Sequence, residues 1–68
     1  METLSNIVKE LRTQNDISQG KLAELVGVTR QTIISLEKGS YIPSLLLAMR
    51  ISEVLDAPIE QIFKKESI

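Results

Sequence analysis

The chain has no cysteine and no histidine among its 68 residues. This absence excludes disulfide frameworks, the common zinc sites and any catalytic thiol or imidazole. The remaining titratable residues show no spacing typical of a nucleophile with its base or of a metal site. We therefore expect a protein that is not an enzyme and that uses no metal or other cofactor.

Aromatic residues and long apolar runs are also scarce. The aromatic residues are one tyrosine, Tyr41, and one phenylalanine, Phe63, which leaves no stacking platform for single-stranded nucleic acid. No apolar run approaches the roughly 18 residues of a membrane span, and the N-terminus METLSNIVKE lacks the features of a signal peptide. We expect a cytoplasmic protein with no membrane partner, and no separate domain for a small-molecule ligand is apparent.

The chain lacks an excess of positive charge, since its formal net charge is −1 and its pI is about 5.3. Proteins that bind polyanions in general usually carry a large positive excess. If DNA is the partner, the basic side chains must gather on one face. Four of them flank the central stretch of the chain, namely Arg12, Lys21, Arg30 and Lys38.

The composition is otherwise that of one small folded domain spanning residues 1–68, with 43% hydrophobic residues and only three glycines and two prolines. Apolar residues recur at helical spacing, as in Leu4, Ile7, Val8 and Leu11. We predict an all-α fold with a core over residues 7–63 and five helices at about 4–14, 19–26, 30–38, 44–55 and 58–63. Apolar Leu4 and Ile68 near the two ends leave open short terminal strands that pair across a dimer.

Residues 19–38 organise this fold as two short helices joined by a tight turn. Gly27 can take the positive φ that ends a helix, and Thr29 is a good N-cap for the next one. Helices of this length joined by about three residues must cross at a large angle. Ala23 permits a close approach, and the apolar side is supplied by Leu22, Val26, Val28, Ile33 and Leu36.

The outer face of the second of these helices has mixed chemistry that packing does not require. Arg30 suits a guanine edge, Gln31 suits an adenine edge, and Ile34 suits a thymine methyl group. Ser35 and Lys38 share this face. The alternative is a solvated helix face with Ile34 packed on a neighbouring loop, and the residues alone leave both interpretations open.

The spacing of these residues resembles that of one known family, the helix-turn-helix regulators of the lambda and 434 repressor, Cro and xenobiotic-response-element type. The resemblance runs from about Ile7 to Phe63 and is closest to compact stand-alone members. It is carried by Gln19, Leu22-Ala23, Val26-Gly27-Val28-Thr29, Ile33, Leu36-Glu37, Gly39, Pro43-Ser44-Leu45, Leu55 and Ile62-Phe63. It implies a five-helix, lambda-repressor-like domain that binds double-stranded DNA as a homodimeric transcriptional regulator, with a repressor favoured.

The resemblance also implies roles for individual residues. The base-reading positions are Arg30, Gln31, Ile34 and Ser35, with Thr32 at their edge. The phosphate-contacting positions are Gln19, Lys38, Ser40, Tyr41 and Ser44, and we expect Arg12, a basic residue beside the motif, to contact phosphate as well. Arg12 and Glu37 also resemble the buried ion pair that ties the first helix of the family to the third.

One recognition helix reads only about 4–5 base pairs, so two copies on a palindromic operator are the economical arrangement. The candidate dimer interface consists of Leu46, Met49, Val54, Phe63 and Ile68. The alternative is that Leu46 and Met49 simply complete the core. A rival to the whole functional hypothesis is a protein-interaction module, such as an antitoxin or adaptor, in which residues 30–38 do not contact DNA.

Overall fold

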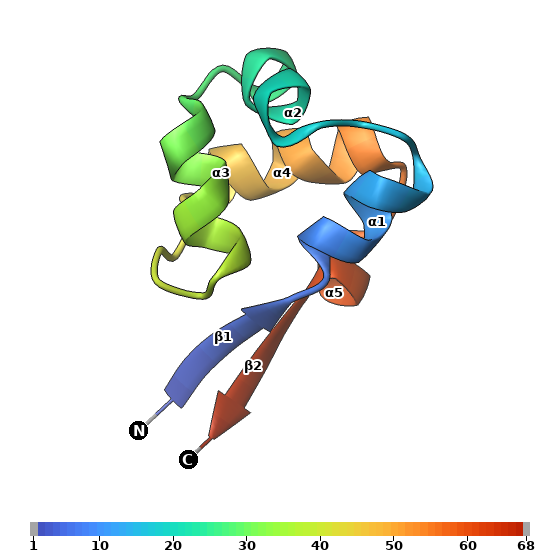
Figure 1. Ribbon diagram of the computed structural model, residues 1–68. Helices are drawn as coiled ribbons and strands as arrows, with labels where there is room; N and C mark the ends of the chain where they lie inside the picture. The colour runs from blue at the N-terminus through green and yellow to red at the C-terminus, as the bar shows by residue number, and fades with distance from the viewer. Residues whose placement is uncertain (1, 68) are drawn as a thin grey trace.

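The computed structural model describes residues 2–67 and shows a small helical body with a two-stranded sheet at one end (Figure 1). Within these residues the elements are β1 (Glu2–Asn6), α1 (Val8–Gln14), α2 (Gln19–Val26), α3 (Arg30–Glu37), α4 (Leu45–Leu55), α5 (Ile59–Ile62) and β2 (Phe63–Ser67). The predicted five-helix architecture is therefore confirmed, with two strands added.

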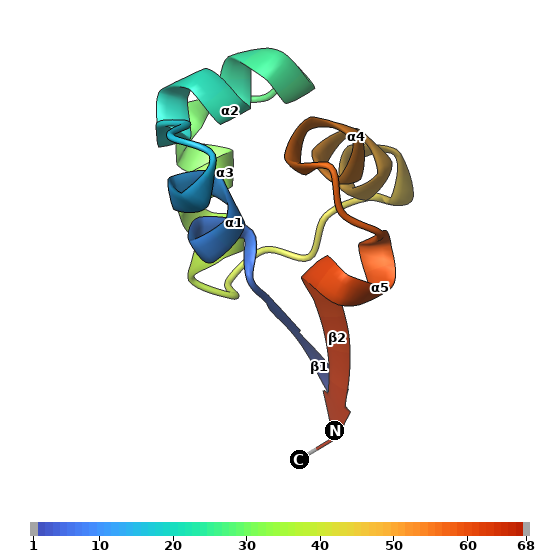
Figure 2. The same cartoon turned by 90° about the vertical axis from the view of Figure 1, so that its right-hand side faces the viewer.

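The two strands pair with each other in antiparallel register, from Glu2 opposite Ser67 to Asn6 opposite Phe63. Figures 1 and 2 both show them projecting side by side from the helices, with the two ends of the chain together. Lys65 reaches Glu2 across the pair with an N–O distance of 3.2 Å. The short terminal strands that the sequence left open are therefore present, but they pair within one chain and not across a dimer; Ile68 lies outside the described residues.

The first helix begins at Val8 rather than at the predicted Leu4. The Asn6 side chain accepts a hydrogen bond from the Val8 N–H (3.1 Å) and so occupies the helix start, as an N-cap side chain does. The same side chain donates to the carbonyl of Leu36 at 2.9 Å. Leu4 packs against the core from β1 instead of from a helix. Asn6 therefore ends the strand, starts α1 and ties both to the end of α3.

The other helix boundaries follow local sequence signals. Three hydroxyl side chains accept a hydrogen bond from a backbone N–H three residues on: Ser18 from Lys21, Thr29 from Thr32 and Ser44 from Leu47. Gly27 ends α2 with φ +78°, the left-handed conformation that favours glycine. Asp56 ends α4 in the same conformation with φ +52°, which a short polar side chain tolerates.

The core gathers buried residues from all five helices and Phe63 at the start of β2. Its fully buried members include Leu22, Val26, Ile33, Leu36, Ile51 and Ile62. Because α2 and α3 both bury one face in this cluster, their crossing is fixed and the opposite face of α3 is left to solvent. None of the helices among residues 2–67 is long and apolar enough to cross a membrane.

Candidate nucleic-acid interface

The turn between α2 and α3 is short and is closed by backbone hydrogen bonds. Gly27 takes the left-handed conformation, and the N–H of Val28 donates to the carbonyl of Ala23 at 3.0 Å. The Thr29 hydroxyl then caps α3 and also lies 3.1 Å from the hydroxyl of Thr32. The turn holds α3 at a large angle to α2 (Figure 1), so the outer face of α3 projects from the body.

That outer face carries the residues expected to read bases. Arg30, Gln31 and Lys38 are exposed, whereas Ile34 and Ser35 are half-buried. Gln31 Nε2 donates to Ser35 Oγ at 3.4 Å, which orients the amide along the helix. Thr32, also half-buried, lies at the edge of this face beside its cap. The structure thus brings Arg30, Gln31, Ile34 and Ser35, four chemically different side chains, together on two turns of one helix.

A buried ion pair supports α3 from behind. Arg12 Nε donates to Glu37 Oε2 at 2.7 Å, and Arg12 Nη2 donates to Glu37 Oε1 at 3.2 Å. The two side chains are only 9% and 5% exposed, and Arg12 Nη1 also donates to the carbonyl of Ile17 at 3.0 Å. The guanidinium of Arg12 is fully engaged in this network, which suits the structural role expected of Arg12 better than the phosphate-contacting one.

The electrostatics of Glu37 follow from this network. Burial alone would raise the pKa of Glu37, but hydrogen bonds from Arg12 and Gln19 and the positive charges of Arg12 and Lys9 outweigh burial and lower the pKa below its ordinary value. Glu37 is therefore a carboxylate at neutral pH. Its negative charge is buried and paired with Arg12 rather than exposed on the surface.

The expected phosphate contacts are spread over three elements. Gln19 is the first residue of α2, Lys38 follows α3, and Ser40 and Tyr41 are exposed in the loop before α4. The hydroxyl of Ser44 already caps α4, so the groups available for a phosphate at this point are the first backbone N–H groups of the helix. The side chain of Gln19 has a bond to Glu37 that sequence reasoning missed: its Nε2 donates to Glu37 Oε1 at 3.0 Å.

The expected dimer residues divide into exposed and buried ones. Leu46 and Met49 are 58% and 48% exposed, so they do not complete the core, whereas Val54 is half-buried and Phe63 is 8% exposed. Ile68 lies outside the described residues. Two side chains outside the prediction are more exposed still, Ile42 at 69% and Leu45 at 71%.

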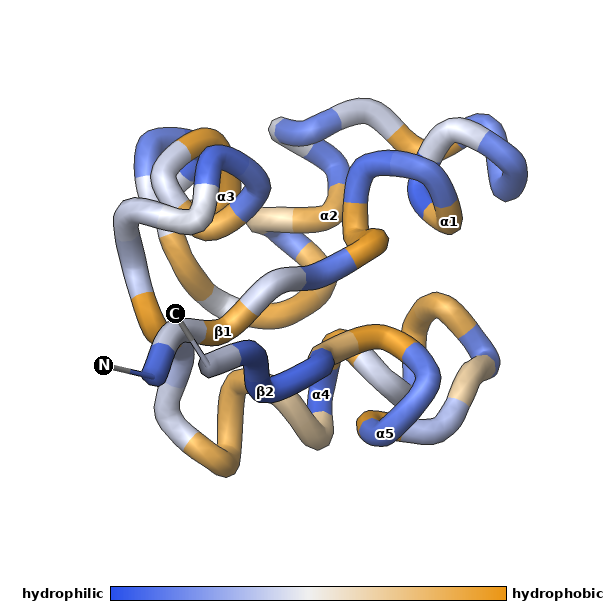
Figure 3. The backbone as a smooth tube through the Cα atoms, turned by 90° about the horizontal axis from the view of Figure 1, so that it is seen from below, coloured by the Kyte–Doolittle hydropathy of each residue, from blue (hydrophilic) through white to orange (hydrophobic). Residues whose placement is uncertain are grey.

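The exposure of Leu45 follows from its place on the helix. Leu45, Leu46 and Met49 lie on the side of α4 opposite the buried Leu47, Ala48, Ile51 and Leu55. Figure 3 shows the hydrophobic run at the start of α4. We call Ile42, Leu45, Leu46 and Met49 the α4 patch.

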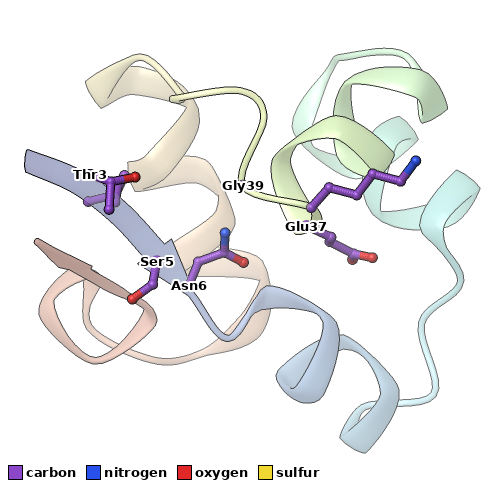
Figure 4. Close-up of a pocket in the computed structure, with 7 residues that line it drawn as sticks. Thr3, Ser5, Asn6, Glu37 and Gly39 are labelled. Carbon is purple, nitrogen blue, oxygen red and sulfur yellow. The ribbon is translucent and has the colours of Figure 1, made fainter. Parts of the chain in front are cut away.

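A pocket of about 310 Å³ lies apart from the outer face of α3, between β1 and the end of the same helix. Figure 4 shows Thr3, Ser5 and Asn6 on one side of it and the segment from Glu37 to Gly39 on the other, with the Glu37 carboxylate turned away from the strand. The Asn6 amide is used in binding Leu36 and Val8. Residues 2–67 contain no group of three or more acidic side chains placed to hold a metal ion.

Comparisons with known proteins agree with this geometry. The helix-turn-helix family model matches residues 8–62. A helix-turn-helix-type transcriptional regulator of Bacillus subtilis, YgzD, is 52% identical over 60 residues, which are 88% of this chain and 91% of the relative. A regulator of the same type from Methanothermobacter thermautotrophicus is 52% identical over 61 residues, 88% of each chain.

Solved structures lead to the same family. The restriction-modification controller protein C.AhdI of Aeromonas hydrophila superposes with a TM-score of 0.74 at 31% identity, covering 79% of this chain and 82% of that one. The transcriptional regulator VanUg superposes with a TM-score of 0.77 at 26% identity, covering 98% and 89%. The chain therefore belongs to the helix-turn-helix transcriptional regulators of the xenobiotic-response-element type, a family of DNA-binding proteins and not of enzymes.

Proposed function

We propose that the protein is a repressor that binds a palindromic operator as a homodimer, with α3 of each copy in the major groove. The observation that carries the proposal is the outer face of α3, where Arg30, Gln31, Ile34 and Ser35 share two turns. An arginine, an amide and an apolar side chain together match the major-groove edges of guanine, adenine and thymine. A module that binds only proteins has no need of this combination.

Selection of bound sequences from a random pool of duplex DNA tests this function. We expect a palindromic motif whose preferred bases change in Gln31→Ala and Arg30→Ala. Gln61→Ala is the matched control, because Gln61 is an exposed glutamine on α5, away from α3. Failure of the wild-type protein to enrich any motif would overturn the proposal and favour the protein-interaction alternative.

The homodimer is proposed to form through the α4 patch. Four large apolar side chains, each about half exposed or more, are gathered in the loop before α4 and on its outer face. A second copy related by a two-fold axis offers the same apolar surface and so buries both patches at once. The patch keeps Leu46 and Met49 from the interface expected from sequence and adds Ile42 and Leu45, whereas Phe63 contributes to the core.

Sedimentation equilibrium tests the dimer. We expect the wild-type protein to be dimeric at micromolar concentration and Leu46→Glu to be monomeric. Leu25→Glu is the control, because Leu25 is 48% exposed on α2, outside the patch. A wild-type monomer at high micromolar concentration would count against the dimer.

Repression is proposed because the described surface divides between a DNA-reading face and an apolar patch suited to a second copy, which leaves little for recruiting polymerase. A reporter promoter that overlaps the selected operator should be expressed less when the protein is present, and increased expression would favour an activator. The relatives are bacterial and archaeal, and such cells hold their DNA in the cytoplasm, where we place the protein.

A further inference from the structure

The pocket between β1 and the end of α3 lies along the free edge of β1. Residues 3–6 of the strand all line it. Successive side chains of a strand point to opposite faces of the sheet, so four consecutive residues reach one pocket only along the edge of the strand. Figures 3 and 4 both show β1 between α3 and β2. We call this space, bounded by residues 3–6 and 37–39, the edge pocket.

The register of the two strands decides which backbone groups of β1 face away from β2. The N–H of Ile7 donates to the carbonyl of Ile62 at 3.0 Å, in continuation of the β1–β2 register. Residues of an antiparallel pair alternate between those that bond the partner strand and those that point away from it. Counting back from Ile7, Ser5 bonds β2, whereas Leu4 directs its N–H and C=O groups away from β2. No other residue among 2–67 bonds these two groups of Leu4.

The end of α3 lies across the edge pocket from the strand. Figure 4 shows the carboxylate of Glu37 turned away from β1, so the charge of Glu37 does not line the pocket. The last carbonyl groups of a helix lack partners within the helix, and no donor among residues 2–67 reaches the carbonyls of Glu37 and Lys38. Asn6 Nδ2 donates to the neighbouring carbonyl of Leu36 at 2.9 Å. An uncharged amide thus already binds this end of the helix.

The two edges of the sheet differ in charge. β2 carries Lys64, Lys65 and Glu66, and charged side chains on an edge strand discourage pairing with a further strand. Residues 3–6 of β1 are threonine, leucine, serine and asparagine, none of them charged. The edge pocket holds about 310 Å³, at the lower end of the range of about 300–1,000 Å³ for ligand pockets. It therefore has room for a short stretch of chain beside β1.

We propose that the edge pocket binds an extended, uncharged peptide segment of another protein, which adds to β1 as a third strand. Main-chain hydrogen bonds with Leu4 hold the segment, as in other cases of strand addition. Serine, threonine or asparagine side chains of the segment donate to the carbonyls at the end of α3. A second copy of this chain does not fit, because the end of α3 stands beside β1 in both copies and the two ends would collide.

The probes for the test are ten-residue peptides selected from a displayed random library on the wild-type protein. We expect uncharged sequences rich in β-branched residues, serine and asparagine, and calorimetry with the synthetic peptides gives their affinities. Amide hydrogen exchange followed by NMR locates the binding. The peptide should slow exchange at Leu4, whose N–H is free in the protein alone. The N–H of Ser5, which faces β2, is the internal reference and should change less.

Two proline variants form a matched pair. Leu4 and Lys65 lie opposite each other in the register, and the N–H of each points away from the other strand. Proline lacks an N–H and is tolerated on an edge strand where that group faces outward. Leu4→Pro should weaken peptide binding at least about tenfold, whereas Lys65→Pro, on the opposite edge, should change it less than about twofold. Thr3→Lys places a charge on β1 and should also weaken binding, so it decides if Leu4→Pro does not fold.

Three results would each overturn the proposal. They are a library that yields no binding peptide, equal weakening by the two proline variants, and unchanged exchange at Leu4. Peptides that lose affinity for Leu46→Glu but not for Leu4→Pro would place the binding on the α4 patch instead. All of these measurements are made without DNA, so their outcome is independent of the operator selection that tests the proposed function.

Discussion

Arg12 and Glu37 join α1 to α3 through two hydrogen bonds to one carboxylate, Nε to Oε2 at 2.7 Å and Nη2 to Oε1 at 3.2 Å. Both side chains are nearly inaccessible to solvent. Because the pair is buried, removing one partner would leave the other as a buried charge without a counter-charge.

Glu37→Ala should therefore destabilise the domain, by about 3–5 kcal/mol, before it changes sequence preference. Urea unfolding followed by circular dichroism measures this loss. Glu24→Ala is the control, because the pair of Glu24 with Lys21 is exposed and contributes little. An unchanged unfolding midpoint in Glu37→Ala would contradict the structural role of the pair.

Stability should also fall at acid pH through Glu37. The pKa of this carboxyl group in the folded protein lies below its ordinary value of 4.5, so on acidification the unfolded chain binds the proton first. The stabilisation is fully present above the ordinary pKa and is lost as the pH falls through the lowered folded value. Thermal melts of the wild type between about pH 6 and pH 3 should show this loss, and melts of Glu37→Gln should show less of it. Parallel pH profiles would argue against Glu37 as the source.

Gly20→Ala should stabilise the protein by about 0.5–1 kcal/mol, because alanine is the better helix former and loses less entropy on folding. The new Cβ atom would meet Arg30 Cδ at 4.0 Å, an ordinary van der Waals contact. Chemical denaturation measures the change. A loss of stability would mean that the first turn of α2 needs the flexibility of glycine.

Gly27→Ala should act in the opposite direction and cost about 1–2 kcal/mol, because the residue has φ +78°. Its Cβ atom would also lie 3.4 Å from Nη1 of Arg50. Denaturation of the two glycine variants under the same conditions compares a helical glycine with a left-handed one. Equal effects of the two substitutions would refute the conformational explanation.

Operator binding should weaken with salt, with a slope that corresponds to about 4–6 phosphates per copy. Lys38→Met should reduce the slope of log K against log salt by about 0.9, the value for one phosphate contact. Fluorescence anisotropy at several salt concentrations measures the slope. An unchanged slope in Lys38→Met would remove Lys38 from the phosphate contacts.

Sequence reasoning found the helices whose ends carry local signals. Ser18, Gly27, Thr29 and Ser44 act within a few residues of their own position, and the structure uses each of them as a helix boundary. The spacing of apolar residues likewise placed α2, α3 and α4. These features depend on neighbours along the chain, so the sequence alone contains them.

The strands depend on partners at the other end of the chain, and local patterns do not report such partners. Leu4 and Ile7 fall at helical spacing with Val8 by coincidence, yet Leu4 lies opposite Lys65 in the sheet. The start of α1 had one local signal, Asn6, a residue that favours helix starts. The contact of Gln19 with Glu37 was likewise invisible, because it requires the crossing of α2 and α3 in three dimensions.

The pairing of β1 with β2 places the first and last described residues of the chain side by side. Glu2 and Ser67 are register partners, so a short peptide can connect the two ends without disturbing the helices. A circularly permuted protein, opened in the exposed loop at residues 40–42, should keep the order of α1 and α2 intact while separating α3 from α4 along the chain. In such a protein α3 would stand next to a free terminus, and its end would be held to the body by the core, the Arg12–Glu37 pair and the bonds from Asn6 to Leu36 and from Gln19 to Glu37.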